Sequence, residues 1–305
     1  MKKIKVQIMT NYSCNFKCEY CYLGSLRKDQ TILDHEILAA RLSEIEQEYQ
    51  IETIGILGGE PTLIGNKLND IIKTVKCFSP KILVITNLSD IDILKDRDIE
   101  ISTSLNLERS CYNQTRAKLL INNNKNLGLN IVVTPSILKK PIKKLINELE
   151  QYRLNTELIR YSASHNNDIV YDVQDDDFSV YLKQFIIEYL KKPRKFKLNN
   201  IQMIEDCIEH KYSPLMDSVI FITPHGKFAS IKYYNNKEDF CLSNDILEFK
   251  KKAEDELNLY RQKCSQCKYF KHCYAEHLKL DEKCSGLLEL LNWYEENIYK
   301  NDRTV

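Results

Sequence analysis

The chain has 305 residues, of which 43% are hydrophobic, and its 44 Lys and Arg residues against 43 Asp and Glu residues leave a net charge of +1. This composition excludes wholesale disorder and gives no long-range attraction to nucleic acid or to an anionic membrane. No apolar run approaches the roughly 20 residues that span a bilayer, and the N-terminus is too polar for a secretory signal. We therefore expect a cytoplasmic protein with neither a membrane nor a nucleic-acid partner.

Short β-branched segments alternate with helical patterns through the first half of the chain. We predict strands at residues 5–10, 53–57, 82–86, 99–105, 129–134 and 158–161, and helices at 35–49, 67–77, 115–127 and 142–152. Such alternation predicts parallel βαβ units with an active site at the carboxyl ends of the strands. Units of roughly 25 residues fit a partial barrel, and they fit a doubly wound sheet equally well.

The alternation stops near residue 161, and a different organisation follows. After polar segments at 165–168 and 175–177, we predict an amphipathic helix at 177–190, a basic linker at 191–200, a β-hairpin at 218–234 and helices at 245–257 and 286–299. Gly226 lies in the turn of the hairpin, where its backbone freedom suits a tight connection. The runs of Asp and Lys are most simply solvated surface.

Eleven cysteines in a reducing compartment indicate metal binding or catalysis before disulfides, and an odd number cannot all be paired. Cys14, Cys18 and Cys21 follow the first predicted strand, where an α/β active site lies. Three thiolates so close in sequence can hold one face of an iron–sulfur cubane and leave the fourth iron open for another ligand. A zinc site or a structural cluster is the alternative, but each typically needs a fourth ligand.

The spacing CxxxCxxC, with Tyr20 just before the last cysteine, resembles the signature of the radical S-adenosylmethionine (SAM) superfamily. The resemblance implies a 4Fe–4S cluster whose open iron chelates the amino and carboxylate groups of SAM, which one electron cleaves to a 5′-deoxyadenosyl radical. It also implies an α/β fold: a partial (β/α)6 barrel of parallel strands with a small C-terminal β-hairpin and helix iron–sulfur domain. The cofactor then supplies the radical chemistry, and the protein orients it and excludes water.

Later segments resemble the SAM-binding motifs of the same superfamily. Residues 58–61 match its GGEP motif, which taken alone also fits a strand-to-helix turn with Pro at its first position. Thr86 and Asn87 stand where the family has Thr-Asn-Gly, with Leu88 in place of the glycine. Residues 104–106 and 113–116 resemble its Ser-Leu-Asp and Asp-x-x-Arg motifs, each with Asn for Asp. The resemblance thus implies SAM contacts from Tyr20, Gly58, Gly59, Glu60, Pro61, Asn87, Ser104, Arg116 and Thr134.

Three cysteines in the C-terminal part have the spacing CxxCxxxxxC: Cys264, Cys267 and Cys273. This spacing resembles the SPASM or twitch extension that carries auxiliary clusters in radical SAM peptide-modifying enzymes. The chain has His277 and Ile231 where that extension has two further cysteines, so we expect one auxiliary 4Fe–4S cluster. Cys284 is its expected fourth ligand, because a helix N-terminus favours a thiolate, with His277 as competitor and a zinc knuckle as the alternative site.

Four cysteines remain outside the two motifs. Cys77 and Cys111 are most simply small packing residues. Cys207 and Cys241 are candidate hydrogen-atom donors for a radical epimerase, although packing also explains each of them. Cys241 is also a third candidate for the fourth auxiliary ligand.

The resemblance implies residues 1–195 as the radical SAM partial barrel and residues 196–305 as a SPASM- or twitch-like auxiliary-cluster domain. The leading hypothesis is a maturase that crosslinks, oxidises or epimerises a ribosomally made peptide (a RiPP) or a protein side chain. The alternatives are a dehydrogenase or epimerase of a small biosynthetic intermediate, and a non-enzymatic metal scaffold. An external flavodoxin- or ferredoxin-like electron donor is implied. Because 13 residues precede Cys14, leader recognition would need a separate leader-binding protein or an improvised surface.

Overall fold

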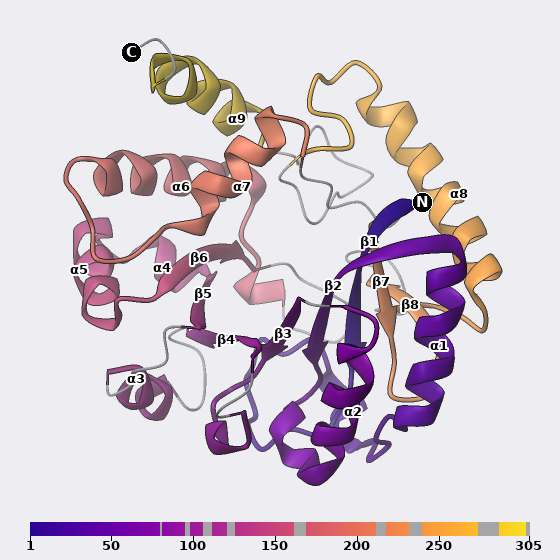
Figure 1. Cartoon of the computed structure of the whole chain (residues 1–305). Coiled ribbons are helices and arrows are strands. Elements are labelled where there is room, and N and C mark those ends of the chain that lie inside the picture. Colours follow the sequence, from indigo (N-terminus) through magenta and orange to yellow (C-terminus); the bar gives the residue numbers. More distant parts are fainter. Residues whose placement is uncertain are drawn as a thin grey trace.

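The computed structural model describes residues 1–79, 81–94, 98–105, 112–120, 126–161, 169–211, 218–231, 240–273 and 287–302. Within these ranges the structure does not describe some side chains of the helices and strands, among them those of Ile231 and Cys241. Figure 1 shows a curved sheet with helices around its outer side.

Six parallel strands form the first part of the sheet: β1 (Lys2–Met9), β2 (Tyr49–Leu57), β3 (Ile82–Ile85), β4 (Glu100–Leu105), β5 (Leu127–Val133) and β6 (Asn155–Arg160). Each strand pairs with the next one along the chain, in the order β6-β5-β4-β3-β2-β1. A doubly wound sheet reverses its strand order among its parallel strands, whereas these six strands follow one another without a reversal. The structure therefore selects the partial barrel from the two folds that the periodicity allowed.

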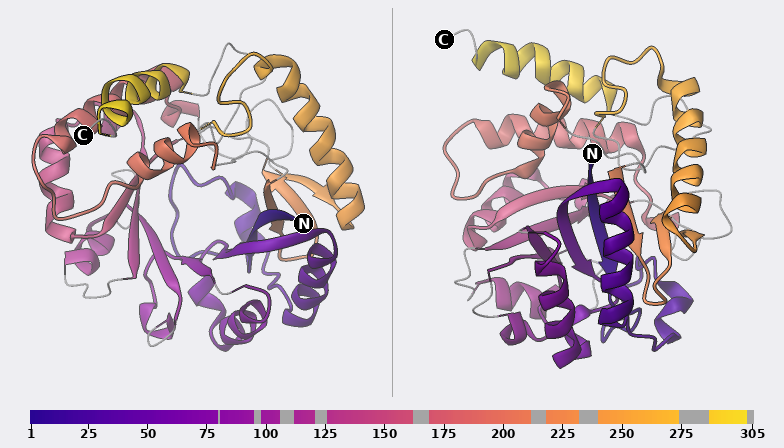
Figure 2. Two further views of the ribbon diagram at one scale, coloured as in Figure 1. Left: turned by 45° about the horizontal axis from the view of Figure 1, so that its top comes forward. Right: turned by 45° about the vertical axis from the view of Figure 1, so that its right-hand side comes forward.

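Helices cover the convex face of this sheet, as Figures 1 and 2 show. They are α1 (His35–Glu48), α2 (Asn66–Lys76), α3 (Tyr112–Leu120), α4 (Pro135–Leu138) and α5 (Ile142–Tyr152), with 3-10 turns η1 (Gly24–Lys28), η2 (Pro61–Ile64) and η3 (Ile91–Leu94). The carboxylate of Asp34 accepts hydrogen bonds from the backbone of Glu36 and Ile37 and so fixes where α1 begins. A continuous set of parallel strands with helices on one side places the strand carboxyl ends together along one rim.

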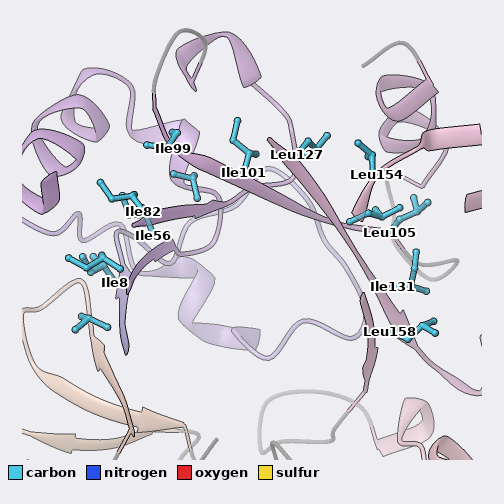
Figure 3. Close-up of a cluster of buried hydrophobic side chains, with 14 of the residues drawn as sticks. Ile8, Ile56, Ile82, Ile99, Ile101, Leu105, Leu127, Ile131, Leu154 and Leu158 are labelled. Carbon is cyan, nitrogen blue, oxygen red and sulfur yellow. The ribbon is translucent and has the colours of Figure 1, made fainter. Parts of the chain in front are cut away.

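The core lies between the strands and these helices (Figure 3). Ile8 and Ile56 on neighbouring strands are fully buried, as is Leu158 at the far edge of the sheet. Burial of one such side chain contributes roughly 1.5–3 kcal/mol. The apolar layer therefore fixes the strand register that positions the rim.

The second half of the chain adds further elements. They are η4 (Ile169–Tyr171), α6 (Asp175–Leu190), α7 (Asn199–Ile208), β7 (Val219–Ile222), β8 (Phe228–Ile231), β9 (Phe240–Ser243), α8 (Ile246–Cys264), α9 (Leu288–Tyr294), the π-helical turn η6 (Glu295–Tyr299) and α10 (Lys300–Asp302). Strand β7 pairs in parallel with β1, so the hairpin continues the barrel sheet in the order β1-β7-β8-β9. The predicted division at residue 195 stays a prediction, and the sheet extends across it.

Several boundaries differ from the sequence-based predictions. Helix α3 begins at Tyr112 and ends at Leu120, and residue Leu127 belongs to β5, not to the helix. Helix α7 begins at Asn199, inside the predicted linker at 191–200, and neither α7 nor β9 was predicted. The Asp residues at 175–177, predicted as a polar segment, form the first turn of α6, where acidic side chains interact favourably with the helix dipole. Asp175 also forms an ion pair with Arg160.

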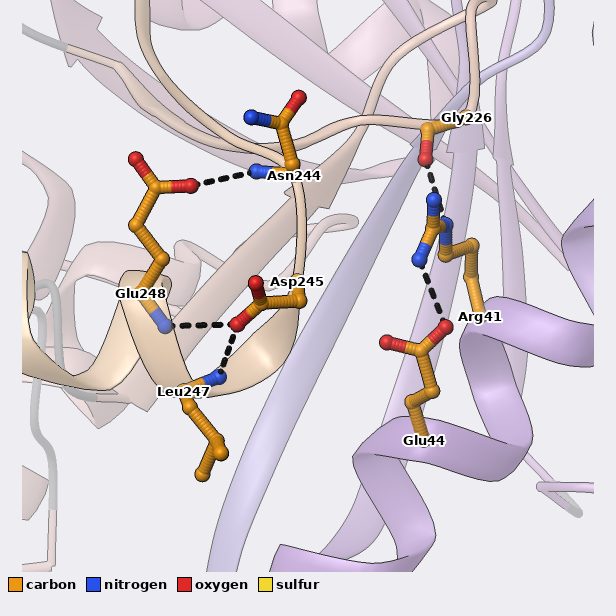
Figure 4. Close-up of polar contacts among 7 residues, drawn as sticks. All are labelled: Arg41, Glu44, Gly226, Asn244, Asp245, Leu247 and Glu248. Atoms are coloured by element: carbon orange, nitrogen blue, oxygen red, sulfur yellow. Dashed lines mark hydrogen bonds and ion pairs between the residues drawn. The ribbon is translucent and has the colours of Figure 1, made fainter.

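The hairpin turn between β7 and β8 contacts the first helix of the barrel (Figure 4). Arg41 on α1 donates from Nε to the carbonyl oxygen of Gly226 at 2.7 Å and pairs with Glu44 at 2.6 Å. Helix α8 begins with a capping arrangement in which Asp245 accepts from two backbone amides and the Glu248 carboxylate accepts from the amide of Asn244 at 2.7 Å. Among the described helices, none has the length and apolarity to cross a bilayer.

Candidate active site

The predicted cluster loop begins where β1 ends, at the rim of the sheet. The amide of Thr10 donates to the carbonyl of Leu57 at 2.8 Å, which aligns the ends of β1 and β2. The amide of Cys21 donates to the Cys18 carbonyl at 3.2 Å and thus makes a tight turn between the last two cysteines. The three thiols are partly exposed and accessible to a cofactor.

Two of the three thiols lie in surroundings that disfavour a bare thiolate. Burial raises the pKa of Cys14, and the Glu60 carboxylate and the other two thiols raise it further, while the amide of Phe16, 3.4 Å from the sulfur, lowers it. Burial also raises the pKa of Cys21. A cation removes this penalty because a coordinating thiol is deprotonated by the metal. The donor set therefore fits an iron–sulfur cluster.

In the part of the chain that the structure describes, no group of three or more His, Cys, Asp or Glu side chains already has the geometry to hold a metal ion. The three sulfurs therefore have to turn toward a common centre when a cluster binds. Partly exposed thiols on a loop can make such rotations without disturbing the core.

Gly58 and Gly59 let the end of β2 approach the backbone of the cluster loop. A Cβ built on Gly59 would lie 2.1 Å from the Ser13 carbonyl oxygen, and one on Gly58 would lie 2.6 Å from Oδ1 of Asn11. Two backbone hydrogen bonds of 2.9 Å, from Gly59 to Asn11 and from Glu60 to Ser13, close this contact. The two glycines therefore allow a close approach to the cluster loop itself.

The Glu60 carboxylate joins the ends of β2 and β3. Its side chain is 1% exposed. Oε1 accepts from the backbone amide and hydroxyl of Thr62 and from the Thr86 hydroxyl, at 3.1, 2.7 and 2.6 Å. Oε2 accepts from the amide of Asn87 at 2.6 Å. These bonds give Glu60 a positioning role that the sequence motif alone does not reveal.

Asn87 connects this network to the first cysteine. Its side-chain amide donates to Oδ1 of Asn15 at 2.9 Å and lies 3.8 Å from the sulfur of Cys14. Its own Oδ1 accepts from the amide of Ser89 at 2.9 Å, and Ser89 in turn accepts from Nδ2 of Asn15 at 2.7 Å. Asn15 occupies a variable position of CxxxCxxC and Ser89 lies outside the motifs, so sequence reasoning missed both of them.

Leu88, in the place of the family's glycine, keeps the backbone conformation that glycine favours. Its φ is +63°, in the left-handed region, and its side chain is buried. Lys118 on α3 donates its ammonium group to the carbonyls of Leu88 and Ser89 and so holds the turn. The chain thus preserves the turn without its glycine.

Arg116 lies away from the other predicted SAM contacts. Its Nε is 3.6 Å from Oε1 of Glu148 on α5, and a bond with Tyr152 raises the pKa of Arg116. Residues two apart on a helix point in different directions, so Lys118 faces the rim turn while Arg116 faces α5. The described contacts give Arg116 a structural role between two outer helices.

The remaining predicted contacts lie on the strand ends. Ser104 is the penultimate residue of β4 and is half-buried beside Asn130. Thr134 directly follows β5 and is fully buried, and Pro61 opens η2. Asn106 lies outside the described residues.

Tyr20 places the cluster loop against the far edge of the barrel. Its ring packs edge-on against Tyr161, just after β6, with ring centroids 6.3 Å apart, and Tyr161 packs likewise against Tyr171 at 6.0 Å. The Tyr171 hydroxyl donates to Glu19. The loop therefore reaches from β1 across to the end of β6.

The C-terminal cysteine motif begins on a helix, not in a loop, because α8 extends to Cys264. Two successive turns follow, with the Cys267 amide donating to the Cys264 carbonyl at 2.9 Å and that of Phe270 to the Cys267 carbonyl at 3.0 Å. Cys264, Cys267 and Cys273 are all partly exposed, and three soft thiol donors within one turn-rich segment suit an iron–sulfur cluster or zinc. The predicted fourth ligand Cys284 and its competitor His277 lie outside the described residues.

The two candidate hydrogen-atom donors differ in placement. Cys207 is fully buried on α7. Cys241 lies on β9, and its side chain is not described. Cys77 is exposed at the end of α2, and Cys111 lies outside the described residues.

Comparison with known proteins agrees with this geometry. Residues 8–131 match the model of the Radical SAM superfamily. A protein of Methanocaldococcus jannaschii named as a candidate glycyl-radical enzyme activating enzyme is 28% identical over 227 residues, which are 68% of this chain and 84% of that protein.

Solved structures resemble the whole fold. That of anSMEcpe with bound S-adenosylmethionine and a Cp18Cys peptide has a TM-score of 0.73 at 15% identity and covers 99% of each chain. That of Streptococcus suis SuiB bound to S-adenosylmethionine has a TM-score of 0.67 at 16% identity and covers 93% of this chain and 76% of that one. With the superfamily match, these likenesses support SAM and a 4Fe–4S cluster as the cofactors that the cysteine motif implies. The chain therefore contains a segment that matches the Radical SAM superfamily, and it is an enzyme.

Proposed function

We propose that this radical SAM enzyme modifies a ribosomally made peptide or a protein side chain, by crosslinking, oxidation or epimerisation. The observation that carries the proposal is a fold likeness over 99% of the chain to a structure that holds S-adenosylmethionine and a peptide together. SuiB, solved with the precursor peptide SuiA, resembles the chain with a TM-score of 0.64. These likenesses support a class of substrate and leave its sequence open.

In this proposal Cys14, Cys18 and Cys21 hold the radical SAM cluster. Bound there, the cluster and SAM supply the reductive cleavage that yields a 5′-deoxyadenosyl radical. The chain's own part is to hold three sulfurs at the rim and to supply backbone N–H donors to them, such as that of Phe16 to Cys14 at 3.4 Å. Fixed donors of this kind stabilise charge without reorganisation during reaction.

In this proposal SAM binds along the rim that the ends of β2 to β5 form. The GGEP segment at 58–61 faces the cluster loop, and Asn87 lies between that segment and Cys14. Tyr20, Ser104 and Thr134 complete the proposed set at the rim. We assign Arg116 only a supporting place behind this surface, because its described partners are on α5.

A C-terminal auxiliary 4Fe–4S cluster of SPASM or twitch type is part of the proposal. Cys264, Cys267 and Cys273 supply three of its ligands from one short segment, and residues 196–305 form the region that presents it. The turns between these cysteines bring their backbones together without long-range ordering.

A second candidate function is activation of a glycyl-radical enzyme. The observation that favours it is the 28% identity to the Methanocaldococcus jannaschii protein over 84% of that protein's length. The substrate would then be a folded protein. Both candidates share the radical SAM chemistry, and they differ in the partner that binds at the rim.

Two further partners are proposed on chemical grounds. Reductive cleavage of SAM requires one electron, so a flavodoxin- or ferredoxin-like protein is the expected donor. A separate leader-binding protein is the expected partner for a peptide substrate. In the test below dithionite replaces the electron donor, and the leader-binding protein is added with the peptide.

The proposal is tested by anaerobic reconstitution with iron, sulfide, dithionite and SAM, and by mass spectrometry of a peptide encoded beside this gene. We expect 5′-deoxyadenosine together with a mass change in the peptide. A variant with Cys14, Cys18 and Cys21 all replaced by Ala should form no 5′-deoxyadenosine, because no cluster remains to reduce SAM.

The outcomes separate the candidates. Undiminished 5′-deoxyadenosine from the triple-Ala variant would overturn the cluster assignment. Cleavage of SAM without any change in the peptide, together with a glycyl radical detected by EPR on an added protein partner, would favour the activating-enzyme function. Turnover of a small metabolite alone would refute the peptide substrate.

A further inference from the structure

Three segments of the C-terminal half meet at one junction. The hydroxyl of Tyr269, in the cysteine segment after α8, donates to Glu295 on η6 at 2.6 Å. The terminal helices are joined to α7 by Tyr294, whose hydroxyl donates to Glu205 at 3.0 Å. Tyr299 donates to Glu209 at 2.7 Å in the same manner. Figures 1 and 2 both show the end of α7 beside the segment that follows α8.

A stacked pair of histidine rings sets how α7 meets the cysteine segment. The rings of His210 and His272 lie with centroids 5.0 Å apart and planes at 10°. His210 stands three residues after Cys207 and donates its amide to the Cys207 carbonyl at 3.2 Å. His272 immediately precedes Cys273. The stacking therefore brings Cys207 and Cys273 to the same side of the junction.

The surroundings of Cys207 agree with this placement. Cys207 is fully buried, and Cys267 and Cys273 pack against the same apolar cluster. Burial raises the pKa of the Cys207 thiol, and the nearby Cys273 raises it further. Packing as a small hydrophobe would explain the burial of Cys207. It would not explain why this thiol lies near that of Cys273 in the cysteine segment.

We propose that Cys207 is the fourth thiolate ligand of the auxiliary cluster, together with Cys264, Cys267 and Cys273. The inference rests on the proposed auxiliary cluster and replaces Cys284 as its fourth ligand. Cys207 sits on the last turns of an ordered helix, and the junction already holds it near Cys273, so the other sulfurs have to turn toward it when a cluster binds. A ligand placed in advance costs less ordering entropy than one that a separate segment must bring. On binding, each of the four thiols forms one iron–sulfur bond and releases one proton to solvent.

The test uses the full chain with Cys14, Cys18 and Cys21 replaced by Ala, so that only the auxiliary site can hold iron. After anaerobic reconstitution this parent should contain about four iron and four sulfide ions per chain, and after reduction it should give the EPR signal of a reduced cluster. Adding Cys207→Ser should remove most of that iron or change the EPR signal, because a hydroxyl replaces the thiolate. Adding Cys284→Ser, or Cys77→Ser at an exposed site, should leave both measurements unchanged.

Folding is controlled separately. Cys207→Ala keeps a small apolar side chain at the buried position, and its far-UV circular dichroism without iron should match that of the parent. Loss of iron from this folded variant supports the assignment. Full iron with an unaltered EPR signal in either Cys207 variant overturns it, and loss of iron on Cys284→Ser instead would assign that residue. A parent without iron, or with zinc in its place, would refute the auxiliary cluster itself.

Discussion

Gly59 shows how a single residue can support a cofactor site through contact with a neighbouring loop. An added Cβ would meet two backbone oxygens, 2.1 Å from that of Ser13 and 2.4 Å from that of Tyr12, and neither can move freely. We predict that Gly59→Ala lowers the free energy of unfolding by about 1–3 kcal/mol and weakens SAM binding, because the cluster loop is displaced. Urea unfolding and SAM binding to reconstituted protein measure the two effects.

The matched control is Gly128→Ala in β5, where an added Cβ would meet nothing closer than 3.7 Å. This variant should unfold like the parent and bind SAM normally. Equal stability and equal SAM affinity in both variants would show that the segment is an ordinary turn.

Leu88 offers a test in which two opposing effects are compared by size. A left-handed backbone costs a non-glycine residue about 1–2 kcal/mol, whereas removal of a buried Leu side chain costs about 2–5 kcal/mol. Both Leu88→Gly and Leu88→Ala should therefore destabilise the protein. Leu88→Gly should destabilise it less, by about 1 kcal/mol, because only glycine relieves the backbone at φ +63°. Denaturant unfolding of the two variants decides, and a more stable Ala variant would contradict the argument.

Asn87 is expected to influence the cluster electronically. Its amide lies 3.8 Å from the sulfur of Cys14, and hydrogen bonds to cluster sulfurs raise the reduction potential. Asn87→Leu should therefore shift the midpoint potential of the cluster to a lower value in an EPR-monitored redox titration. Asn15→Leu removes a partner of Asn87 and leaves the donor in place, so its shift should be smaller. An unchanged midpoint potential in Asn87→Leu would show that Asn87 does not influence the cluster.

At the scale of elements, the sequence predicts the strands better than their surroundings. The six strands and the helices at residues 35 and 142 could be predicted because their apolar periodicity is strong and local. The end of α3, the helix α7 and strand β9 could not, because tertiary contacts decide them: Asn200 near the start of α7 bonds both to the amide and to the carbonyl of Leu158 at 2.8 Å.

The candidate site shows the same division. The spacing of Cys14, Cys18 and Cys21 and the GGEP segment are visible in the sequence. The four hydrogen bonds of Glu60 join residues that are up to 27 positions apart, and no pattern in the sequence reports them. The placement of Arg116 against α5 likewise depends on how two helices pack.

The contact between the β7–β8 turn and the cluster-loop side of the barrel should depend on pH. Nε2 of His225 lies 2.8 Å from Oδ2 of Asp29, whose other oxygen accepts from the amide of Thr31 at 2.8 Å. Bonds from Thr31, and then His225, lower the pKa of Asp29 to about 2. The carboxylate therefore stabilises the fold above its unfolded pKa near 4, and this contribution is lost as the pH falls toward 2.

We predict that Asp29→Asn lowers the free energy of unfolding at pH 7 by less than about 1 kcal/mol, because the pair is partly exposed. The difference between parent and variant should vanish as the pH falls from 4 to 2. Unfolding measured across this range tests the prediction, and a difference that stays constant down to pH 2 would contradict it.

At the scale of the whole molecule, residues beyond 195 extend the barrel sheet. Strand β7 covers the edge of β1 with four paired residues, from Lys5 with Val219 to Ile8 with Ile222. At the opposite edge, Leu198 forms a bridge to Thr156, and the side chain of Asn200 bonds to β6. Residues beyond 195 therefore cover both edges of the parallel sheet, which would otherwise present unpaired backbone groups.

This arrangement predicts that residues 1–195 do not form a stable unit alone. The fragment would expose β1 and β6 at once, and exposed strand edges promote association. We expect it to aggregate, and a fragment of residues 1–211 to remain more soluble because Asn200 still covers β6.

The full chain should unfold in a single cooperative transition. Residues 196–305 expressed together with 1–195 should restore solubility, because they supply β7 to the edge of β1. Size-exclusion chromatography and thermal unfolding measure these outcomes. A monomeric fragment 1–195 with its own cooperative transition at the temperature of the full chain would show instead that residue 195 is a true domain boundary.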